Sequence, residues 1–131
     1  MIGLDTNVLV RYLTQDDPVQ SARATDLLEH RLSEEAPGFI STVVMVETAW
    51  VLRRAYRFTT TEIAAAIERM LAADVLVVES EQEVYSAMTA LREGLGSFAD
   101  VLIGAIGSRE GCSHTATFDQ KALRLPNFAP A

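Results

Sequence analysis

The feature that most constrains the fold is a regular alternation of short apolar runs with longer segments of helical periodicity. Strand-like runs occupy residues 2–5, 39–41, 75–78 and 114–118. Helical patterns occupy residues 7–13, 18–33, 42–56, 59–70, 81–92, 97–109 and 119–123. Strands that alternate with helices predict an α/β fold whose mostly parallel sheet is covered by helices on both faces. In such sheets the functional site lies beyond the carboxyl ends of the strands.

The length of 131 residues fits one domain, so we expect a single domain over residues 1–131. Cys112 is the only cysteine, which excludes an intrachain disulfide and a cysteine-based metal site. The first residues lack the pattern of a signal peptide, and no apolar run reaches the roughly 18 residues that span a bilayer. We therefore expect a cytoplasmic protein that does not associate with membranes.

The net charge of −7 argues at first against a nucleic-acid-binding protein, because Lys and Arg supply the attraction for phosphate. However, ten of the eleven basic residues are Arg, whose planar fork of donors suits phosphate. A GC-rich genome that encodes Arg by default explains the same bias equally well. The charge therefore leaves both interpretations open.

Two acidic residues stand where predicted strands end. Asp5 ends the first strand and precedes Thr6 and Asn7, and Asp119 follows Thr117 and Phe118. Either carboxylate can simply cap the next helix, which is a common role for Asp. Their shared position at strand ends also makes them candidates for a functional site.

Two further acidic residues lie on predicted helices with apolar surroundings. At 100° per residue, Glu47 shares a face with Val43 and Trp50, and a carboxylate on an apolar stripe is costly without a compensating cation. Arg54 lies two turns along the same face, so a structural ion pair is the alternative. Asp100 stands three residues after Ser97 in a capping-box pattern, yet it opens a helix that is apolar on nearly every side.

Together, these four carboxylates would repel one another in a low-dielectric site unless cations were bound. A ligand set of oxygens alone selects a hard ion such as Mg²⁺ or Mn²⁺ over Zn²⁺. Such an ion polarises a phosphate and generates a nucleophilic water, so the pattern indicates phosphoryl chemistry. Without the four acids the chain carries 14 acidic and 11 basic residues, a net charge of only −3.

The same residues closely resemble the PIN-domain proteins, especially the VapC-type toxins of bacterial toxin–antitoxin pairs. The resemblance rests on segment 3–13 (GLDTNVLVRYL), on Val46 with Glu47, on segment 98–104 (FADVLIG) and on segment 117–119 (TFD), which occur in the family's order. It implies a three-layer α/β/α fold with a five-stranded parallel sheet in the order 3-2-1-4-5. It also implies an Mg²⁺- or Mn²⁺-dependent endoribonuclease that hydrolyses RNA phosphodiester bonds and needs no organic cofactor.

By this resemblance the catalytic, metal-binding residues are Asp5, Glu47, Asp100 and Asp119. Asp5 and Asp100 are expected to be the most direct metal ligands. The resemblance implies supporting roles for Thr6, Asn7, Ser97 and Thr117 and places possible RNA contacts at Arg11, Arg54, Lys121 and Arg124. Many relatives carry a further Asp at the position of Ser97, so the number of metals stays open. The expected partners are the RNA substrate, an antitoxin protein and a second copy of the chain in a homodimer.

Two other functions are compatible with parts of the pattern. A PIN-like module without catalysis would bind RNA or protein, although it would have no reason to keep four mutually repelling acids. A phosphatase of the haloacid dehalogenase type would use Asp5 as its nucleophile. Those enzymes carry a second Asp two residues later, where this chain has Asn7.

Overall fold

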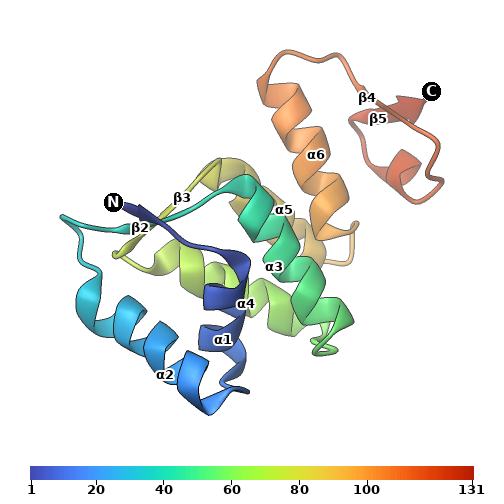
Figure 1. Cartoon of the computed structure of the whole chain (residues 1–131). Coiled ribbons are helices and arrows are strands. Elements are labelled where there is room, and N and C mark those ends of the chain that lie inside the picture. The colour runs from blue at the N-terminus through green and yellow to red at the C-terminus, as the bar shows by residue number, and fades with distance from the viewer. The chain divides into compact units, whose positions relative to one another are not determined.

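Short parallel strands alternate with six α-helices along the chain, and the computed structural model describes residues 1–131 (Figure 1). The chain divides into an N-terminal unit, Met1–Glu79, and a C-terminal unit, Ser80–Ala131, each of which is described by itself. The N-terminal unit contains β1 (Ile2–Gly3), α1 (Thr6–Thr14), α2 (Pro18–Asp26), the π-helical turn η1 (Leu27–Arg31), β2 (Gly38–Ile40), α3 (Thr42–Arg54), α4 (Thr60–Ala72) and β3 (Leu76–Val78). The C-terminal unit contains α5 (Glu81–Arg92), α6 (Phe98–Arg109), β4 (Thr115–Thr117), the 3₁₀ turn η2 (Ala122–Arg124) and β5 (Phe128–Pro130).

All strand pairs are parallel, which confirms the predicted α/β class. In the N-terminal unit β2 lies between β1 and β3, with Gly38 paired to Ile2 on one side and to Leu76 on the other. In the C-terminal unit β4 pairs with β5. These pairings agree with the 3-2-1 and 4-5 portions of the expected strand order. The junction between the two portions stays a prediction.

Polar residues at or just before the predicted helix starts act as helix caps. Ser41 caps α3, Ser97 caps α6, and Thr59 caps α4 in a full capping box with Glu62. For α1 the sequence leaves the cap open between Asp5 and Thr6, and the structure has Asp5 as the cap, with its Oδ1 accepting from the Thr6 backbone N–H at 2.8 Å. The Thr6 hydroxyl is therefore free for another partner.

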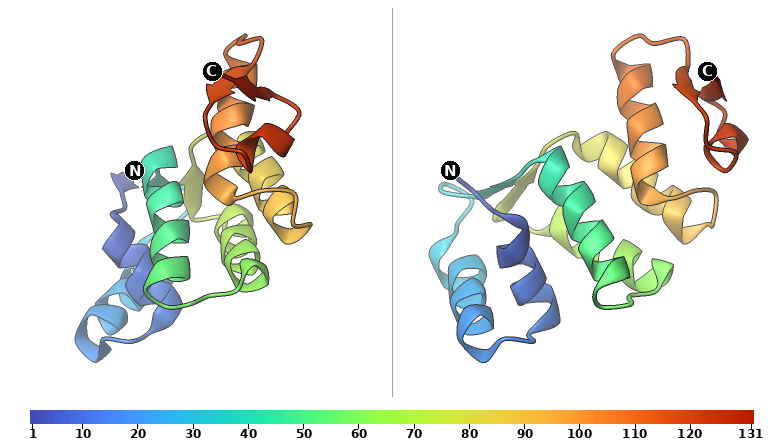
Figure 2. Two further views of the ribbon diagram at one scale, coloured as in Figure 1. Left: turned by 90° about the vertical axis from the view of Figure 1, so that its right-hand side faces the viewer. Right: turned by 45° about the vertical axis from the view of Figure 1, so that its right-hand side comes forward.

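The core of the N-terminal unit lies between its sheet and helices. Fully buried side chains come from α1, β2, α3 and α4 and include Leu9, Ile40, Met45, Leu52 and Ile67. Helix α1 packs against both α2 and α3, and the views in Figures 1 and 2 show α2 running beside α1. Consequently α1 presents one side to α2 and another to α3, which sets the position of the hollows described below.

In the C-terminal unit, α5 and α6 pack side by side (Figure 2). Val84, Met88 and Leu102 are its largest fully buried side chains. The helix that we predicted to begin at 119 is only the 3₁₀ turn η2, and β5 was missing from the strand-like runs. That strand ends in Pro130, and its three residues are too short to give an apolar period.

The helix predicted over residues 18–33 is present, but its last turn is widened. Pro18 occupies the first turn of α2, where a missing N–H costs nothing. At the other end, the Leu32 N–H donates to the Leu27 carbonyl five residues back at 3.0 Å. Such i→i+5 bonding defines a π-helical turn.

As for membranes, none of the helices combines the length and the apolar character that crossing a bilayer requires.

Candidate active site

A short hydrogen-bonded chain links two of the predicted site acids in the N-terminal unit. The cap Asp5 stands between β1 and α1, and the next residue, Thr6, is buried with 7% exposure. The Thr6 hydroxyl donates to Oε1 of Glu47, which lies 41 residues away on α3. The backbone N–H of Thr6 thus contacts Asp5 and its hydroxyl contacts Glu47, while its supporting role in a metal site stays a prediction.

Both carboxylates keep one oxygen without a hydrogen-bond partner. Oδ1 of Asp5 accepts from the Thr6 N–H and Oε1 of Glu47 accepts from the Thr6 hydroxyl, whereas Oδ2 and Oε2 accept nothing. Asp5 and Glu47 are exposed and line the same cavity of about 410 Å³ between α1 and α3. The rest of the wall comes from the two helices and the turn after α3: Thr6, Asn7, Val10, Arg11, Val51, Ala55 and Tyr56. Two free carboxylate oxygens in one open cavity form a ligand set that suits a hard divalent cation.

The exposure of Glu47 corrects one step of the sequence interpretation. We expected the face of α3 shared with Val43 and Trp50 to be buried, but these two side chains are 76% and 61% exposed. The buried face of the helix is formed instead by Met45, Thr48, Ala49 and Leu52. Glu47 therefore bears no large desolvation cost, and its interest lies in its contact with Thr6.

The structure also excludes the ion pair between Glu47 and Arg54. The Arg54 guanidinium lies 5.8 Å from the centre of the Trp50 ring, in a cation–π contact, and makes no ion pair. Because Arg54 does not line the cavity either, the expected RNA contact at this residue stays a prediction.

A cluster of polar side chains fixes Arg11 at the edge of the cavity. Its guanidinium contacts an Asp16 carboxylate oxygen at 3.1 Å and donates to the Tyr56 hydroxyl at 3.0 Å. The Tyr56 hydroxyl in turn donates to Asp16 at 2.5 Å, and this bond is the main cause that lowers the pKa of Asp16. Burial opposes the charged form of Arg11, but attraction to Asp16 and Tyr56 outweighs it and raises the pKa of Arg11. Arg11 on α1 is therefore charged, and its guanidinium is held by Asp16 and by Tyr56, which follows α3.

The other predicted site residues lie in the C-terminal unit. Asp100 is half-buried in the first turn of α6, and its backbone N–H donates to Oγ of Ser97 at 3.1 Å, while its carboxylate has no hydrogen-bond partner. Asp119 is exposed after β4; its N–H donates to Thr117 and its Oδ1 accepts from the Lys121 N–H at 2.8 Å. Lys121 and Arg124 are exposed at and near η2.

Within either unit, no group of three or more acidic, histidine or cysteine side chains is arranged to hold a metal ion. The pair in the N-terminal unit is Asp5 with Glu47. The acids of the C-terminal unit, Asp100 and Asp119, fit a metal by chemistry, since each offers carboxylate oxygen, but their joint role with the first pair is a proposal.

The PIN domain family model matches residues 2–127, almost the entire chain. The chain belongs to the PIN domain family. PIN domains are generally nucleases, and PIN nucleases generally use divalent metal ions. No curated protein matches the sequence.

Membership of the PIN domain family gives the cavity beside Asp5 its chemical context. A nuclease site must attract a phosphodiester and a cation, and the cavity wall offers two carboxylates together with the fixed cation Arg11. The sequence interpretation missed four residues of this wall, of which only Tyr56 is polar; the others are Val10, Val51 and Ala55. Tyr56 follows the end of α3, so the helical spacing that joins Glu47 and Val51 on one face does not extend to it.

Proposed function

We propose that this PIN domain is an Mg²⁺- or Mn²⁺-dependent endoribonuclease that acts as the toxin of a toxin–antitoxin pair. The observation that carries the proposal is the pair of carboxylates, Asp5 and Glu47, that line one open cavity and are both tied to Thr6. A protein that only bound RNA would gain nothing from two acidic groups on the wall of its binding cavity, because they repel phosphate.

By their place in the segments that resemble the PIN motifs, Asp5, Glu47, Asp100 and Asp119 would each offer carboxylate oxygen to the cation. A bound Mg²⁺ or Mn²⁺ would polarise the scissile phosphate and lower the pKa of a water. Asp5 and Glu47 would each contribute the oxygen that accepts no hydrogen bond. Thr6 orients the Glu47 carboxylate through its hydroxyl, as groups behind metal ligands commonly do. Arg11 stands at the cavity edge with its positive charge, where a phosphate of the substrate would pass.

The proposal extends to partners and place of action. The resemblance of segments 3–13, 98–104 and 117–119 to VapC-type toxins supports an antitoxin partner and a homodimer. Cleavage of cellular RNA would take place in the cytoplasm, where that substrate is found. The acidic cavity would accept a basic side chain of an antitoxin, which would replace the cation and block the reaction.

The direct test is cleavage of single-stranded RNA by the purified protein. We expect cleavage with Mg²⁺ or Mn²⁺, none with EDTA, and a loss of at least about 100-fold in Asp5→Asn and in Asp100→Asn, since each removes an anionic ligand. Asp74→Asn is the matched control, because Asp74 is an exposed acid that does not line the cavity of Asp5 and Glu47.

Growth after expression in a bacterial host tests the toxin role separately. The wild-type chain should arrest growth, and Asp5→Asn should not. Cleavage that persists in EDTA, or full activity in both Asn variants, would refute the metal assignment. RNA binding with no cleavage under any metal would instead support a catalytically inactive binding module.

A further inference from the structure

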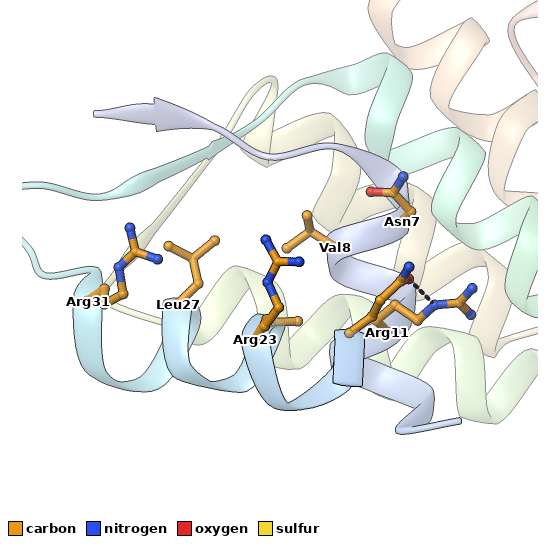
Figure 3. A pocket seen from close by; sticks show the side chains of 8 residues that line it. Asn7, Val8, Arg11, Arg23, Leu27 and Arg31 are labelled. Atoms are coloured by element: carbon orange, nitrogen blue, oxygen red, sulfur yellow. Dashed lines mark hydrogen bonds between the residues drawn. The ribbon is translucent and has the colours of Figure 1, made fainter. Parts of the chain in front are cut away.

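A second hollow of the N-terminal unit lies on the other side of α1. It has a volume of about 280 Å³ and lies between α1 and the α2–η1 segment (Figure 3). Its wall combines three arginines, two amides and three apolar side chains: Asn7, Val8, Arg11, Gln20, Arg23, Ala24, Leu27 and Arg31. No acidic residue lines it. Three of the chain's ten arginines thus meet in one cleft of a protein whose net charge is −7.

Two of the three arginines have no partner within the protein. Arg11 is held by Asp16, but Arg23 and Arg31 are exposed and make no ion pair or side-chain hydrogen bond. Figure 3 shows both guanidinium groups extending from α2 and η1 toward the space beside α1. Like charges that face one cleft without counter-charges repel one another, and an anion in the cleft would relieve this repulsion.

The widened turn η1 explains how Arg31 reaches the same cleft as Arg23. In a regular α-helix residues four apart are offset by about 40°, so residues 23 and 31 would diverge by about 80°. A π-helical turn holds more residues and rotates less per residue, which offsets this drift. As a result Arg23, Leu27 and Arg31 occupy successive turns on one face, as Figure 3 shows.

The hydrogen-bonding groups of the cleft are mostly donors. The Gln20 Oε1 already accepts from the Arg11 Nε at 2.8 Å, which leaves the Gln20 amide N–H₂ for a ligand. The Asn7 side chain makes no hydrogen bond in the protein, so its amide is available too. A wall of guanidinium and amide donors complements a ligand rich in acceptors and negative charge, as a phosphodiester backbone is.

The cleft adjoins the cavity that Asp5 and Glu47 line. Asn7 and Arg11, one turn apart on α1, line both hollows and form the edge between them. A strand that places one phosphate beside Asp5 can therefore lay its next phosphates across this edge toward Arg23. This adjacency favours a nucleic-acid strand over an acidic protein segment, which would be repelled by the carboxylates of the neighbouring cavity.

We propose that the cleft between α1 and the α2–η1 segment binds the phosphate backbone of single-stranded RNA next to the cut site, with Arg23 and Arg31 as the phosphate contacts. The inference rests on the proposed nuclease function for its choice of RNA. It assigns to this cleft the affinity for the substrate strand, while the acids of the neighbouring cavity carry the chemistry.

Binding in EDTA tests the cleft without cleavage. The probe is a fluorescent single-stranded oligoribonucleotide of ten residues, measured by anisotropy at several salt concentrations. Each phosphate contact on a single strand contributes about 0.7 to the slope of log K against log salt, so Arg23→Gln with Arg31→Gln should lower the slope by about 1.4. Between 50 and 200 mM salt the wild type should therefore lose about 7-fold more affinity than the double variant does.

The matched control removes two arginines elsewhere on the N-terminal unit. Arg53→Gln with Arg57→Gln changes the net charge equally, and neither residue lines the cleft or the cavity. This control should keep the wild-type slope, since it leaves the proposed contacts intact. Circular dichroism checks that both double variants are folded.

A second readout uses substrate length. With Mg²⁺, loss of Arg23 and Arg31 should raise KM for the ten-residue RNA about 10-fold with kcat unchanged, and should leave a dinucleotide substrate unaffected because it does not reach the cleft. If the Arg23/Arg31 double variant kept both the wild-type salt slope and the wild-type KM, the cleft assignment would be wrong. Cleavage of RNA by the wild type would then still support the nuclease function. The opposite result, no cleavage but a reduced slope, would refute the nuclease function and keep the RNA-binding cleft. If a deca-glutamate peptide bound in an Arg23- and Arg31-dependent way and RNA did not, an acidic protein segment would be the occupant and the proposal would fail.

Discussion

Replacement of Thr6 by Val is the sharpest test of how the two site acids are held. Val keeps the size and β-branching of Thr but removes the hydroxyl that donates to Oε1 of Glu47. Thr6 has only 7% of its surface exposed, so the added methyl group faces the protein, whereas the exposed Glu47 can turn to water. The variant therefore removes one hydrogen bond and little else.

The expected size of the effect follows from this asymmetry. A hydrogen bond that is exchanged for one to water contributes about 1 kcal/mol, whereas a buried group left without a partner costs up to about 3 kcal/mol. In the variant, water can hydrogen-bond to Glu47, and the Val side chain has no polar group that would be left without a partner. The free energy of unfolding should therefore fall by about 1 kcal/mol. For cleavage, loss of a group that orients a metal ligand typically costs about 10–100-fold.

Urea unfolding measures the first effect, and Trp50, the chain's only tryptophan, reports from the same helix as Glu47. With a urea dependence of about 2 kcal/mol per molar, the midpoint of Thr6→Val should fall by about 0.5 M. Thr6→Ser keeps the hydroxyl and should retain most of the activity. Equal losses in the Val and Ser variants, or no loss in either, would refute the role assigned to this hydrogen bond.

Two further predictions concern other parts of the chain. Tyr56→Phe removes the hydrogen bond that holds the pKa of Asp16 below its usual value, so the stability that this bond adds is present above about pH 4 and is lost as the pH falls through the lowered pKa. Urea titrations from pH 7 to pH 3 should show the variant's deficit shrinking toward acid, and a deficit that grew would contradict the assignment. Gly104→Ala places a Cβ 2.7 Å from Cε2 of Phe128, so the C-terminal unit should lose about 1–3 kcal/mol by overpacking, whereas Gly3→Ala meets no atom within 4 Å. Hydrogen exchange of the α6 amides should speed up in the first variant alone, and equal protection in both would show that β5 does not pack closely on this helix.

The sequence predicted the helices well because their ends carry specific signals. Thr59 with Glu62, Pro18, Ser41 and Ser97 each supply a terminal group that satisfies or replaces a free backbone N–H, and all act at the expected helix starts. Strands gave a weaker signal because each has only two or three residues. Such a length cannot show alternation, and β5 was therefore found only in the structure.

The role of Thr6 shows what local patterns cannot decide. Asp5 and Thr6 are adjacent, and both are good caps, so the sequence offered no means to choose between them. The choice depends on Glu47, 41 residues away, which accepts from the Thr6 hydroxyl and leaves the cap to Asp5. Likewise, the apolar stripe beside Glu47 was assigned to the core because periodicity shows that a face exists but does not show which face the neighbouring elements cover.

Net charge is a poor guide to the local charge of the two hollows, and screening gives the physical reason. Screening limits the reach of an exposed charge to about 8–10 Å in physiological salt, so a ligand responds to the groups around its own cleft. Two hollows that share the Asn7–Arg11 edge have opposite linings, carboxylates on one side and arginines without partners on the other. The net charge of −7 sums the charges of the whole chain and therefore describes neither hollow. The spacing of Arg23 and Arg31 did not predict the cleft either. On a regular α-helix, two residues that are eight positions apart point in different directions, and only the π-helical turn that begins at Leu27 brings these two onto one face.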